Sequence, residues 1–536
     1  MKSRRQLTII ACCVLFSLGT ARAAETPYDL VLRNARVVDG TGNPWYRADI
    51  AIRGDVIARI APSIDEPATR VVDIGGLVVA PGFIDLHTHA MRGIFLVPTA
   101  DNYVRQGVTT IMEGPDGGSP VPLKPFLDKL AALPKSLNIG SFIGQGSVRE
   151  AVIGLANRPA TAEELERMRG IVRDGMRDGA FGMSTGLFYV PGNFTPLAEV
   201  VELQKVVAPF RGLHTSHMRD EASRVIDSVK ETIAIGEQGG VPTQISHHKI
   251  IGKSYWGKSV ETLKLVEEAR ARGFDATIDQ YPYTASSTSI GAALLPQWAQ
   301  EGGHQATVQR LKDAPVRAKI KSAIADSIRD ERGGGDPANI VVSICDWDAK
   351  LAGKNLAELT VARGQAVNID NAAETTMWIV EQGNCGGVFH AMDEQDLQRI
   401  IRHPATMIAS DGTVPIFGLG APHPRSYGTL ARVLAVYVRD KKILTLEDAV
   451  RKMSSYPAAR LGLTDRGVLK PGMKADIAVF DPATVKDMAT FEKPHQYAVG
   501  FPYVIVNGKI VYENGAMTAE RPGRVLYGPG AGFASR

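Results

Sequence analysis

Two histidines one residue apart, His87 and His89, are the strongest chemical signal in the sequence. They follow a Pro81-Gly82 turn and a short apolar run, and alternate side chains of a strand share one face. Two neutral imidazoles on one face are suited to a divalent metal such as zinc. An isolated pair of this kind is equally compatible with a solvated turn, so the prediction of a metal site depends on further ligands.

Further metal-ligating side chains follow later apolar runs. His217, His247 and Asp411 each stand at the end of such a run. Two acids, Glu113 and Asp116, follow an earlier one. Because the carboxyl ends of parallel strands converge on one face of a barrel, we expect these side chains to meet the first histidine pair.

Asp411 is the candidate catalytic group. A carboxylate beside a metal-activated water can accept a proton from the water and then donate it to the departing amine nitrogen. Aspartate after a strand also commonly caps a helix or stabilises a turn. Its place in an ordered series with four histidines favours the catalytic interpretation.

The middle of the chain, residues 81–465, alternates short apolar strands with amphipathic helices. Expected helices include 162–177, 223–237 and 260–272. Repeated βα units imply a parallel sheet, and this many favour a closed (β/α)8 TIM-like barrel. Residues 291–344 interrupt the pattern and are predicted to be an insertion in one βα loop, either a lid or a peripheral decoration.

Both ends of the chain have the pattern of short strands separated by turns. The first such region is 24–80, and the second, with a terminal tail, is 466–536. The predicted fold class is therefore α/β, with a small β-sandwich domain built from both termini beside the barrel.

Residues 1–23 are predicted to be a signal peptide. Basic residues at Lys2, Arg4 and Arg5 precede an apolar run, and Ala21-Arg22-Ala23 fits a cleavage site. The sequence thus predicts an exported, periplasmic protein, with a twin-arginine signal as one option. A lipoprotein-like box at Ile10-Ala11-Cys12 is less favoured than simple cleavage, and no later stretch predicts a stable membrane span.

The charge balance gives no support to a nucleic-acid partner. The predicted leader removes four of the 61 basic residues and none of the 57 acidic ones, so the rest of the chain is balanced. Only Cys345 and Cys385 lie outside the leader. They form neither a disulfide framework nor a zinc-finger spacing, and a single bridge between them stays open.

Several longer motifs carry a family resemblance. They are PGFIDLHTH (81–89), GVTT (107–110), STGLFYVP (184–191), SHMRDE (216–221), SHHK (246–249), DQYPY (279–283), SDG (410–412) and HPRSYGT (423–429). Together they resemble the amidohydrolase superfamily and, within it, the D-aminoacylase (N-acyl-D-amino-acid deacylase) family. The resemblance covers nearly the whole chain after the leader.

The resemblance implies roles for the metal-ligating residues. His217 and His247 would hold a tightly bound zinc, His87 and His89 would serve a second metal position, and Asp411 would be the catalytic carboxylate. One or two Zn²⁺ ions are therefore expected as cofactor.

The resemblance also implies a small-molecule substrate held by Tyr189, Lys249, Tyr283 and Arg425. A free α-carboxylate needs a fixed positive partner, for which arginine offers a bidentate fork and lysine a point charge. Two further histidines, His214 and His248, match no ligand position, and we expect them to support the ligands instead.

The chain departs from the family at one ligand. Where the family has a metal-binding cysteine after the GVTT segment, this sequence has Asp116, an oxygen ligand that tolerates harder metals than a thiolate does. Glu113 is the second candidate for that position, and Asp116 is favoured by its register.

The expected activity is hydrolysis of N-acyl-D-amino acids to a carboxylate and a D-amino acid, with the chirality implied by the resemblance alone. The alternatives are a dipeptidase acting on D-residue-containing dipeptides, another amide or cyclic-amide hydrolase of the superfamily, and a non-catalytic exported binding protein. The sequence leaves the side-chain specificity and the oligomeric state open.

Overall fold

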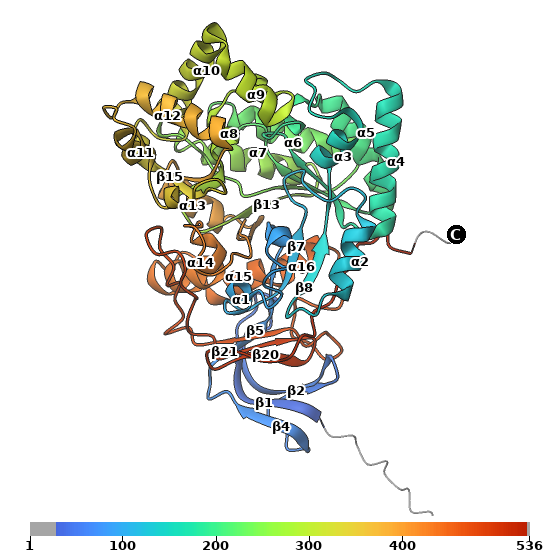
Figure 1. Ribbon diagram of the computed structural model, residues 1–536. Helices are drawn as coiled ribbons and strands as arrows, with labels where there is room; N and C mark the ends of the chain where they lie inside the picture. Colours follow the sequence, from blue (N-terminus) through green and yellow to red (C-terminus); the bar gives the residue numbers. More distant parts are fainter. Residues whose placement is uncertain (1–27, 533–536) are drawn as a thin grey trace, which may run out of the picture.

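The computed structural model describes residues 28–532, so the predicted signal peptide lies outside the described residues. Figure 1 shows a barrel surrounded by helices and, below it, a β domain. Within residues 28–532 no helix combines the length and the apolar character that a membrane span requires.

Eight consecutive strand positions form the barrel. They are β6 (Phe83–Asp85), β7 (Val108–Glu113), β8 (Asn138–Ser141) continued by β9 (Ile143–Gly144), β10 (Gly182–Gly186), β11 (Leu213–His217), β12 (Thr243–Ile245), β13 (Ala276–Gln280) and β17 (Thr406–Ile408). Each pairs in parallel with the next. A parallel bridge between Thr88 and Gly412 joins the first strand position to the last and closes the barrel, which confirms the predicted (β/α)8 fold.

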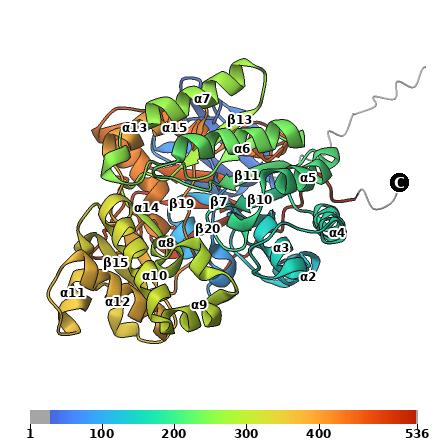
Figure 2. The ribbon, with the colours of Figure 1, turned by 90° about the horizontal axis from the view of Figure 1, so that it is seen from above.

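Helices surround this barrel, as the view from above shows (Figure 2). They are α1 (Asp101–Val104), α2 (Lys124–Ala132), α3 (Gln145–Ile153), α4 (Ala162–Asp178), α5 (Leu197–Val207), α6 (Val225–Gly239), α7 (Ser259–Ala271), α13 (Glu394–Arg402), α14 (Arg425–Arg432), α15 (Leu446–Met453) and α16 (Ser455–Arg460). The three helices expected from periodicity correspond to α4, α6 and α7, with ends within two residues.

Helix α4 shows how local sequence fixes such an element. It begins with a capping box, in which Thr161 and Glu164 each accept a hydrogen bond from the other's backbone N–H. Met168, Val172 and Met176 are buried at intervals of four residues, so they share the face that packs on the barrel.

The β domain is assembled from the two ends of the chain, as predicted. Its nine-stranded sheet takes β1 (Tyr28–Val37), β2 (Tyr46–Arg53), β3 (Val56–Ala61), β4 (Ala68–Asp73) and β5 (Val78–Pro81) from one end, and β18 (Ile477–Phe480), β19 (Tyr503–Val506), β20 (Lys509–Glu513) and β21 (Ala516–Met517) from the other. Antiparallel pairing of β5 with β18 joins the two halves. The sheet therefore holds the start and the end of the barrel together.

The insertion is longer than the expected 291–344. Strands β14 (Ser286–Ser289), β15 (Ile340–Ile344) and β16 (Gly386–Phe389) form one antiparallel sheet. Helices pack with it: α8 (Ile290–Leu294), α9 (Gly303–Lys312), α10 (Ala314–Asp326), α11 (Leu356–Ala362) and α12 (Ile369–Gln382). Because β15 is paired to β16, residues 345–389 belong to the insertion, although their helical periodicity resembles that of barrel helices.

A disulfide between Cys345 and Cys385 closes this unit near the ends of β15 and β16. The bridge that the sequence left open is therefore present in the structure. The insertion has its own apolar core, which includes Ile320, Leu356 and Phe389.

Candidate active site

A cavity of about 900 Å³ lies at the carboxyl ends of the barrel strands. Its walls come from the loops after the strands and from the insertion, which contributes Ser287, Arg332 and Ile344. The insertion thus covers one side of the site instead of decorating a distant surface.

Six predicted residues, four of which line the cavity, form two overlapping groups. The first group comprises His87, His89, Asp116 and Asp411, and the second comprises Asp116, His217 and His247. In each group the ligand atoms lie within 4.8 Å of one another. The structure therefore brings together every predicted metal ligand and the predicted catalytic carboxylate.

Asp116 is shared by the two groups. Its Oδ2 lies 3.4 Å from His89 Nε2, 3.5 Å from His217 Nδ1 and 3.4 Å from His247 Nε2. Its Oδ1 lies 3.4 Å from His87 Nε2. Oδ2 thus lies near ligands of both groups and Oδ1 lies near His87, so Asp116 is placed to serve both metal positions.

The hydrogen bonding of these atoms fits a cation. His87 Nε2, Asp116 Oδ1 and both ring nitrogens of His217 are buried and have no hydrogen-bond partner among the described residues. Buried polar atoms without partners are costly, and here His87 Nε2 and His217 Nδ1 both face the Asp116 carboxylate. Imidazole nitrogens with a carboxylate suit zinc, and the oxygen ligand also accepts harder divalent metals.

The charges of the cluster reinforce one another. Burial raises the pKa of the Asp116 carboxyl, but His87 and His247 outweigh it and hold this pKa well below its ordinary value. Burial likewise lowers the pKa of His89, but Asp116 and Asp411 raise it to about 9. The carboxylate therefore stays ionised, and the site attracts positive charge.

Backbone conformation contributes to the site as well. Asp116, His247 and Asp411 all have positive φ, at 53°, 35° and 51°. Non-glycine residues rarely adopt this region, and such strain is concentrated at functional sites. All three residues stand two or three positions after the ends of β7, β12 and β17.

Glu113, the second candidate for the ligand after the GVTT segment, has another role. Its carboxylate accepts hydrogen bonds from Thr88 Oγ1 at 2.7 Å and from the backbone N–H groups of Ala90 at 2.6 Å and Met91 at 2.9 Å. Glu113 thus fixes the loop that follows His89, and the structure places Asp116 at the ligand position.

Three acids that the sequence did not single out hold the ligands in place. Asp279 accepts the backbone N–H of His247 at 2.7 Å and lies 3.7 Å from His87 Nδ1. Asp85 accepts the backbone N–H groups of Ser410 and His87 at 3.1 and 3.3 Å. Glu221 lies 3.3 Å from His247 Nδ1. Asp279 and Glu221 belong to the DQYPY and SHMRDE motifs, which was the available signal.

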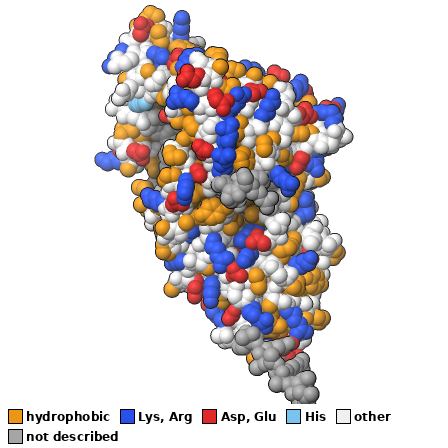
Figure 3. Space-filling view, turned by 90° about the vertical axis from the view of Figure 1, so that its right-hand side faces the viewer, with side chains coloured by type: hydrophobic (Ala, Val, Ile, Leu, Met, Phe, Trp, Pro, Cys, Tyr) orange, Lys and Arg blue, Asp and Glu red, His pale blue; other side chains and the backbone are white. Residues whose placement is uncertain are grey.

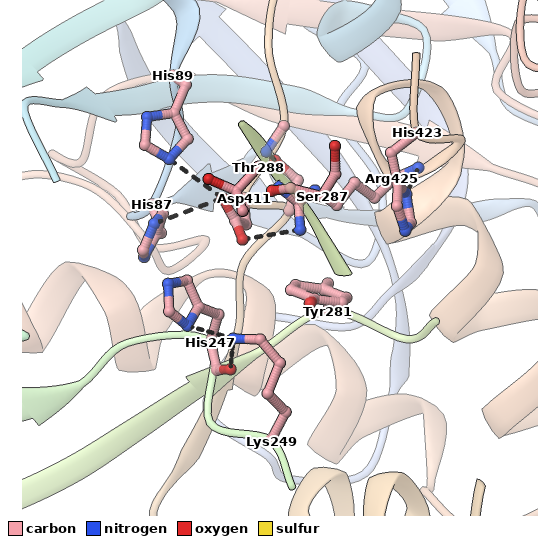
Figure 4. Close-up of polar contacts among 12 residues, drawn as sticks. His87, His89, His247, Lys249, Tyr281, Ser287, Thr288, Asp411, His423 and Arg425 are labelled. Carbon is pink, nitrogen blue, oxygen red and sulfur yellow. Dashed lines mark hydrogen bonds and ion pairs between the residues drawn. The ribbon is translucent and has the colours of Figure 1, made fainter. Parts of the chain in front are cut away.

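Two predicted substrate-binding cations converge beside the metal ligands (Figure 4). Lys249 Nζ and the Arg425 guanidinium lie 5.7 and 4.7 Å from the centre of the Tyr281 ring. Arg425 Nη1 also lies 2.8 Å from Asp411 Oδ2. Tyr189 lines the cavity, and its hydroxyl is 3.1 Å from Thr288 Oγ1.

Tyr283 is the predicted substrate residue that the structure does not bring to the cavity. Its hydroxyl lies 3.5 Å from Asp487 Oδ2, and its ring packs on His423. The chain turns at Pro282, where the backbone N–H of Tyr283 donates to the carbonyl of Tyr281. As a result, the ring close to Lys249 and Arg425 is that of Tyr281 and not that of Tyr283.

The two histidines outside the ligand set have structural partners. His214 contacts Thr185 Oγ1 at 3.0 Å and Thr243 Oγ1 at 3.3 Å, and His248 contacts Thr262 Oγ1 at 2.7 Å. Burial lowers the pKa of both to about 3. Both are neutral supports within the barrel wall.

Arg332 is a cavity residue that sequence reasoning missed. It comes from the insertion, is 4% exposed, and its guanidinium lies 4.9 Å from the centre of the Phe188 ring. Its Nε has no hydrogen-bond partner among the described residues. No local pattern marks it, because its partners Phe188 and Glu221 are more than 100 residues away in sequence.

Comparisons with known proteins agree with this geometry. The model of the Amidohydrolase family matches residues 70–512. D-aminoacylase of Alcaligenes xylosoxydans xylosoxydans is 36% identical over 94% of this chain and 99% of its own length. N-acyl-D-glutamate deacylase of the same organism is 35% identical over 93% and 96%.

Solved structures give the same result. A crystal structure of D-aminoacylase superimposes with a TM-score of 0.80 at 35% identity, covering 94% of this chain and all of that one. N-acyl-D-glutamate deacylase from Bordetella bronchiseptica, complexed with zinc and a phosphonate inhibitor that mimics the tetrahedral intermediate, also gives 0.80, at 32% identity and with the same coverage. The chain therefore belongs to the amidohydrolase family and, within it, to the D-aminoacylase family.

Proposed function

We propose that this protein is a metal-dependent hydrolase of N-acyl-D-amino acids, which it splits into a carboxylate and a D-amino acid. The observation that carries the proposal is the position of Asp411. Its carboxylate lies 3.1 Å from the ligand His89 and 2.8 Å from the predicted carboxylate anchor Arg425. The catalytic group therefore stands between the metal ligand His89 and the substrate-binding cation Arg425.

Zinc is the proposed cofactor, in one or two ions. His217, His247 and Asp116 would hold one ion, and His87, His89 and Asp116 the other. A D-aminoacylase structure at 34% identity has a binuclear metal centre, with activation by one metal and attenuation by the second. When bound, zinc lowers the pKa of a coordinated water and polarises an amide carbonyl.

Asp411 then moves the proton. Burial raises the pKa of its carboxyl, but Arg425 and the neighbouring histidines outweigh it and keep this pKa low, so the group is ionised and able to accept a proton. It takes the proton from the attacking water and returns it to the amide nitrogen as the C–N bond breaks. The amine leaves as the D-amino acid, and no covalent bond to the protein forms.

Arg425 and Lys249 recognise the free α-carboxylate of the substrate. Lys249 follows β12 and Arg425 begins α14, and both lie close to the Tyr281 ring, so the carboxylate meets a fork and a point charge together. The D configuration is supported by the relatives, which act on D-amino-acid derivatives.

The test combines a catalytic variant with metal analysis. We expect Asp411→Asn to lower kcat for an N-acetyl-D-amino acid by about 100-fold or more, because general acid–base catalysis contributes at least this much. Bound zinc, measured by inductively coupled plasma mass spectrometry, should still include the ion held by His217 and His247. A variant that keeps full activity would contradict the assignment, and a wild-type protein without any hydrolysis would favour a binding protein.

We also propose that the protein is exported to the periplasm through a cleaved signal peptide. The support is the leader pattern of residues 1–23 together with the disulfide Cys345–Cys385, since structural disulfides persist in oxidising compartments. Cell fractionation and N-terminal sequencing of the protein should give a periplasmic chain that starts near Ala24. A cytoplasmic chain that starts at Met1 would contradict this.

A further inference from the structure

One wall of the active-site cavity is apolar and continues to the surface. Lining residues on the loops after β6 and β17 include Met91, Leu96, Val414, Ile416 and Leu419. From Met91 to Leu96 on the first loop and from Thr413 to Leu419 on the second, the lining residues that the structure describes are uncharged. We call these five residues, together with Ile344 of the insertion, the apolar wall.

Four members of the apolar wall are unusually exposed for their type. Leu96 is 67% exposed, Leu419 48%, Ile344 44% and Ile416 42%. Single exposed aliphatic residues are ordinary on a protein surface, but several at the rim of one cavity indicate a binding surface. On the face drawn in Figure 3, apolar side chains are interspersed with charged ones.

The wall is a continuous, fixed surface. A Cβ atom placed on Gly93 would lie 1.8 Å from the carbonyl oxygen of Val414, so the two loops touch at their backbones. Asn102 Nδ2 donates to the carbonyl of Thr413 at 2.9 Å and fixes the second loop. The backbone N–H of Ala421 donates to the carbonyl of Ser343 at 2.7 Å, which joins this loop to the insertion beside Ile344.

Asp411 shows which half of the substrate faces the wall. Arg425 contacts Oδ2 of Asp411, whereas His89 contacts Oδ1. In Figure 4 the His89 and Arg425 side chains lie on opposite sides of this carboxylate. If Arg425 and Lys249 hold the amino-acid half, the acyl half extends past His89, where Met91 and Leu96 begin the wall.

The cavity is also larger than a short acyl group needs. Its volume of about 900 Å³ is near the top of the range of about 300–1,000 Å³ found for pockets that enclose drug-sized ligands. An N-acetyl-amino acid is much smaller than such a ligand. An N-acetyl-amino acid would therefore leave part of the cavity unfilled next to its acyl group, where the apolar wall lines the cavity.

We infer that the apolar wall binds an extended hydrocarbon acyl chain, so that the preferred substrates are N-acyl-D-amino acids with medium-length or long acyl groups. This inference rests on the proposed function. A longer acyl chain is transferred from water to the apolar wall, but the reacting atoms stay the same. We therefore expect the longer chain to lower KM and to change kcat little.

The test measures chain-length dependence on the zinc-loaded full-length mature enzyme. N-acetyl, N-butyryl, N-hexanoyl and N-octanoyl derivatives of one D-amino acid are compared by kcat/KM. Each methylene that leaves water should increase kcat/KM about fourfold, so three buried methylenes give a rise of about 50-fold. A flat or falling series, with the acetyl derivative hydrolysed, overturns the inference and leaves the proposed function intact.

Two variants locate the effect. We expect Leu96→Ser and Ile416→Ser to reduce the octanoyl-to-acetyl ratio of kcat/KM by at least about threefold each, and this ratio does not depend on the fraction of folded enzyme. Val361→Ser is the matched control, because Val361 is 59% exposed on α11 and outside the cavity lining. It should keep the wild-type ratio. A ratio unchanged in both wall variants contradicts the inference.

The other possible occupant of the wall is the side chain of the amino acid. N-acetyl derivatives of D-alanine, D-leucine and D-phenylalanine form the second arm of the test. If the wall variants remove the differences in kcat/KM among these three derivatives and leave the dependence on acyl-chain length unchanged, the wall binds the side chain and the inference is wrong.

A binding measurement keeps the inference testable without turnover. Isothermal titration of zinc-loaded Asp411→Asn should give a dissociation constant for the N-octanoyl derivative at least about tenfold lower than that for the N-acetyl derivative. Equal dissociation constants overturn the inference. Absence of hydrolysis at every chain length by the wild type would instead contradict the proposed function.

Discussion

Asp116 lies at the centre of the metal-ligating groups and presents both of its oxygens to them. Four histidine nitrogens lie within 3.5 Å of its carboxylate oxygens. They belong to His87 and His89 after β6, His217 at the end of β11 and His247 after β12. A carboxylate at this position can bridge two ions as a thiolate can, but it is a harder ligand and weakens the preference for soft metals. The metal chemistry of this chain therefore depends on Asp116 more than on any single histidine.

Substitution of Asp116 tests this role. We expect Asp116→Asn to lower the metal content of the protein, because the neutral amide cannot neutralise the charge of two ions, and to lower zinc affinity at least about tenfold. Metal content is measured by inductively coupled plasma mass spectrometry after dialysis. Glu113→Gln is the matched comparison, since Glu113 binds only the backbone and Thr88 in the structure. Metal loss in Glu113→Gln with full retention in Asp116→Asn would reverse the assignment.

Arg332 adds a third cation to the cavity: its Nη2 lies 3.8 Å from Glu221 Oε2, and its Nε has no hydrogen-bond partner among the described residues. We expect Arg332→Met to raise KM by about 10- to 100-fold, as the loss of a charge-assisted hydrogen bond to substrate does. Arg329→Met is the control, because Arg329 lies on the same turn and pairs with Asp326 at the surface. Steady-state kinetics of both variants provide the measurement. An unchanged KM in Arg332→Met would show that Arg332 does not contact substrate.

At the scale of elements, the sequence predicts the barrel strands better than the loops and the insertion that follow them. His217 and Asp411 could be placed because each ends an apolar run, and parallel strands bring such ends together. The position of Tyr283 could not be predicted in this way, because the direction of its side chain depends on the turn at Pro282. The far boundary of the insertion was missed for a similar reason, since β15 pairs with β16 across a connection that contains α11 and α12.

His214 gives a prediction for the barrel wall. It bridges β10 and β12 as a neutral ring, and burial lowers its pKa to about 3, against about 6.5 in an unfolded chain. Between pH 3 and 6.5 the unfolded state binds more protons, so the free energy of unfolding should fall as the pH is lowered through this window.

Replacement of this histidine should remove part of that dependence. We expect His214→Gln to reduce the slope of unfolding free energy against pH by up to about 1.4 kcal/mol per pH unit below pH 6.5. Denaturant unfolding of both proteins between pH 4 and 8 measures it. Above pH 6.5 the two curves should run parallel. An equal slope below pH 6.5 in both proteins would show that His214 is not the titrating group.

At the scale of the whole molecule, the site depends on three units of the fold. The barrel supplies the metal ligands, the sheet made from both termini holds the barrel ends together, and the insertion closes the cavity with Arg332 and Ile344. The order of motifs along the chain predicted the barrel and its ligands. The contribution of the insertion could not be predicted, because it depends on contacts such as Ala421 with Ser343 that no local pattern encodes.

The central claim is that this assembled site hydrolyses N-acyl amino acids of the D configuration. Its most direct test is chiral chromatography of the products formed from a racemic N-acyl amino acid by the zinc-loaded enzyme. We expect release of the D-amino acid and of the carboxylate of the acyl group, with the L-derivative left intact. Release of the L-amino acid, or of equal amounts of both enantiomers, would contradict it.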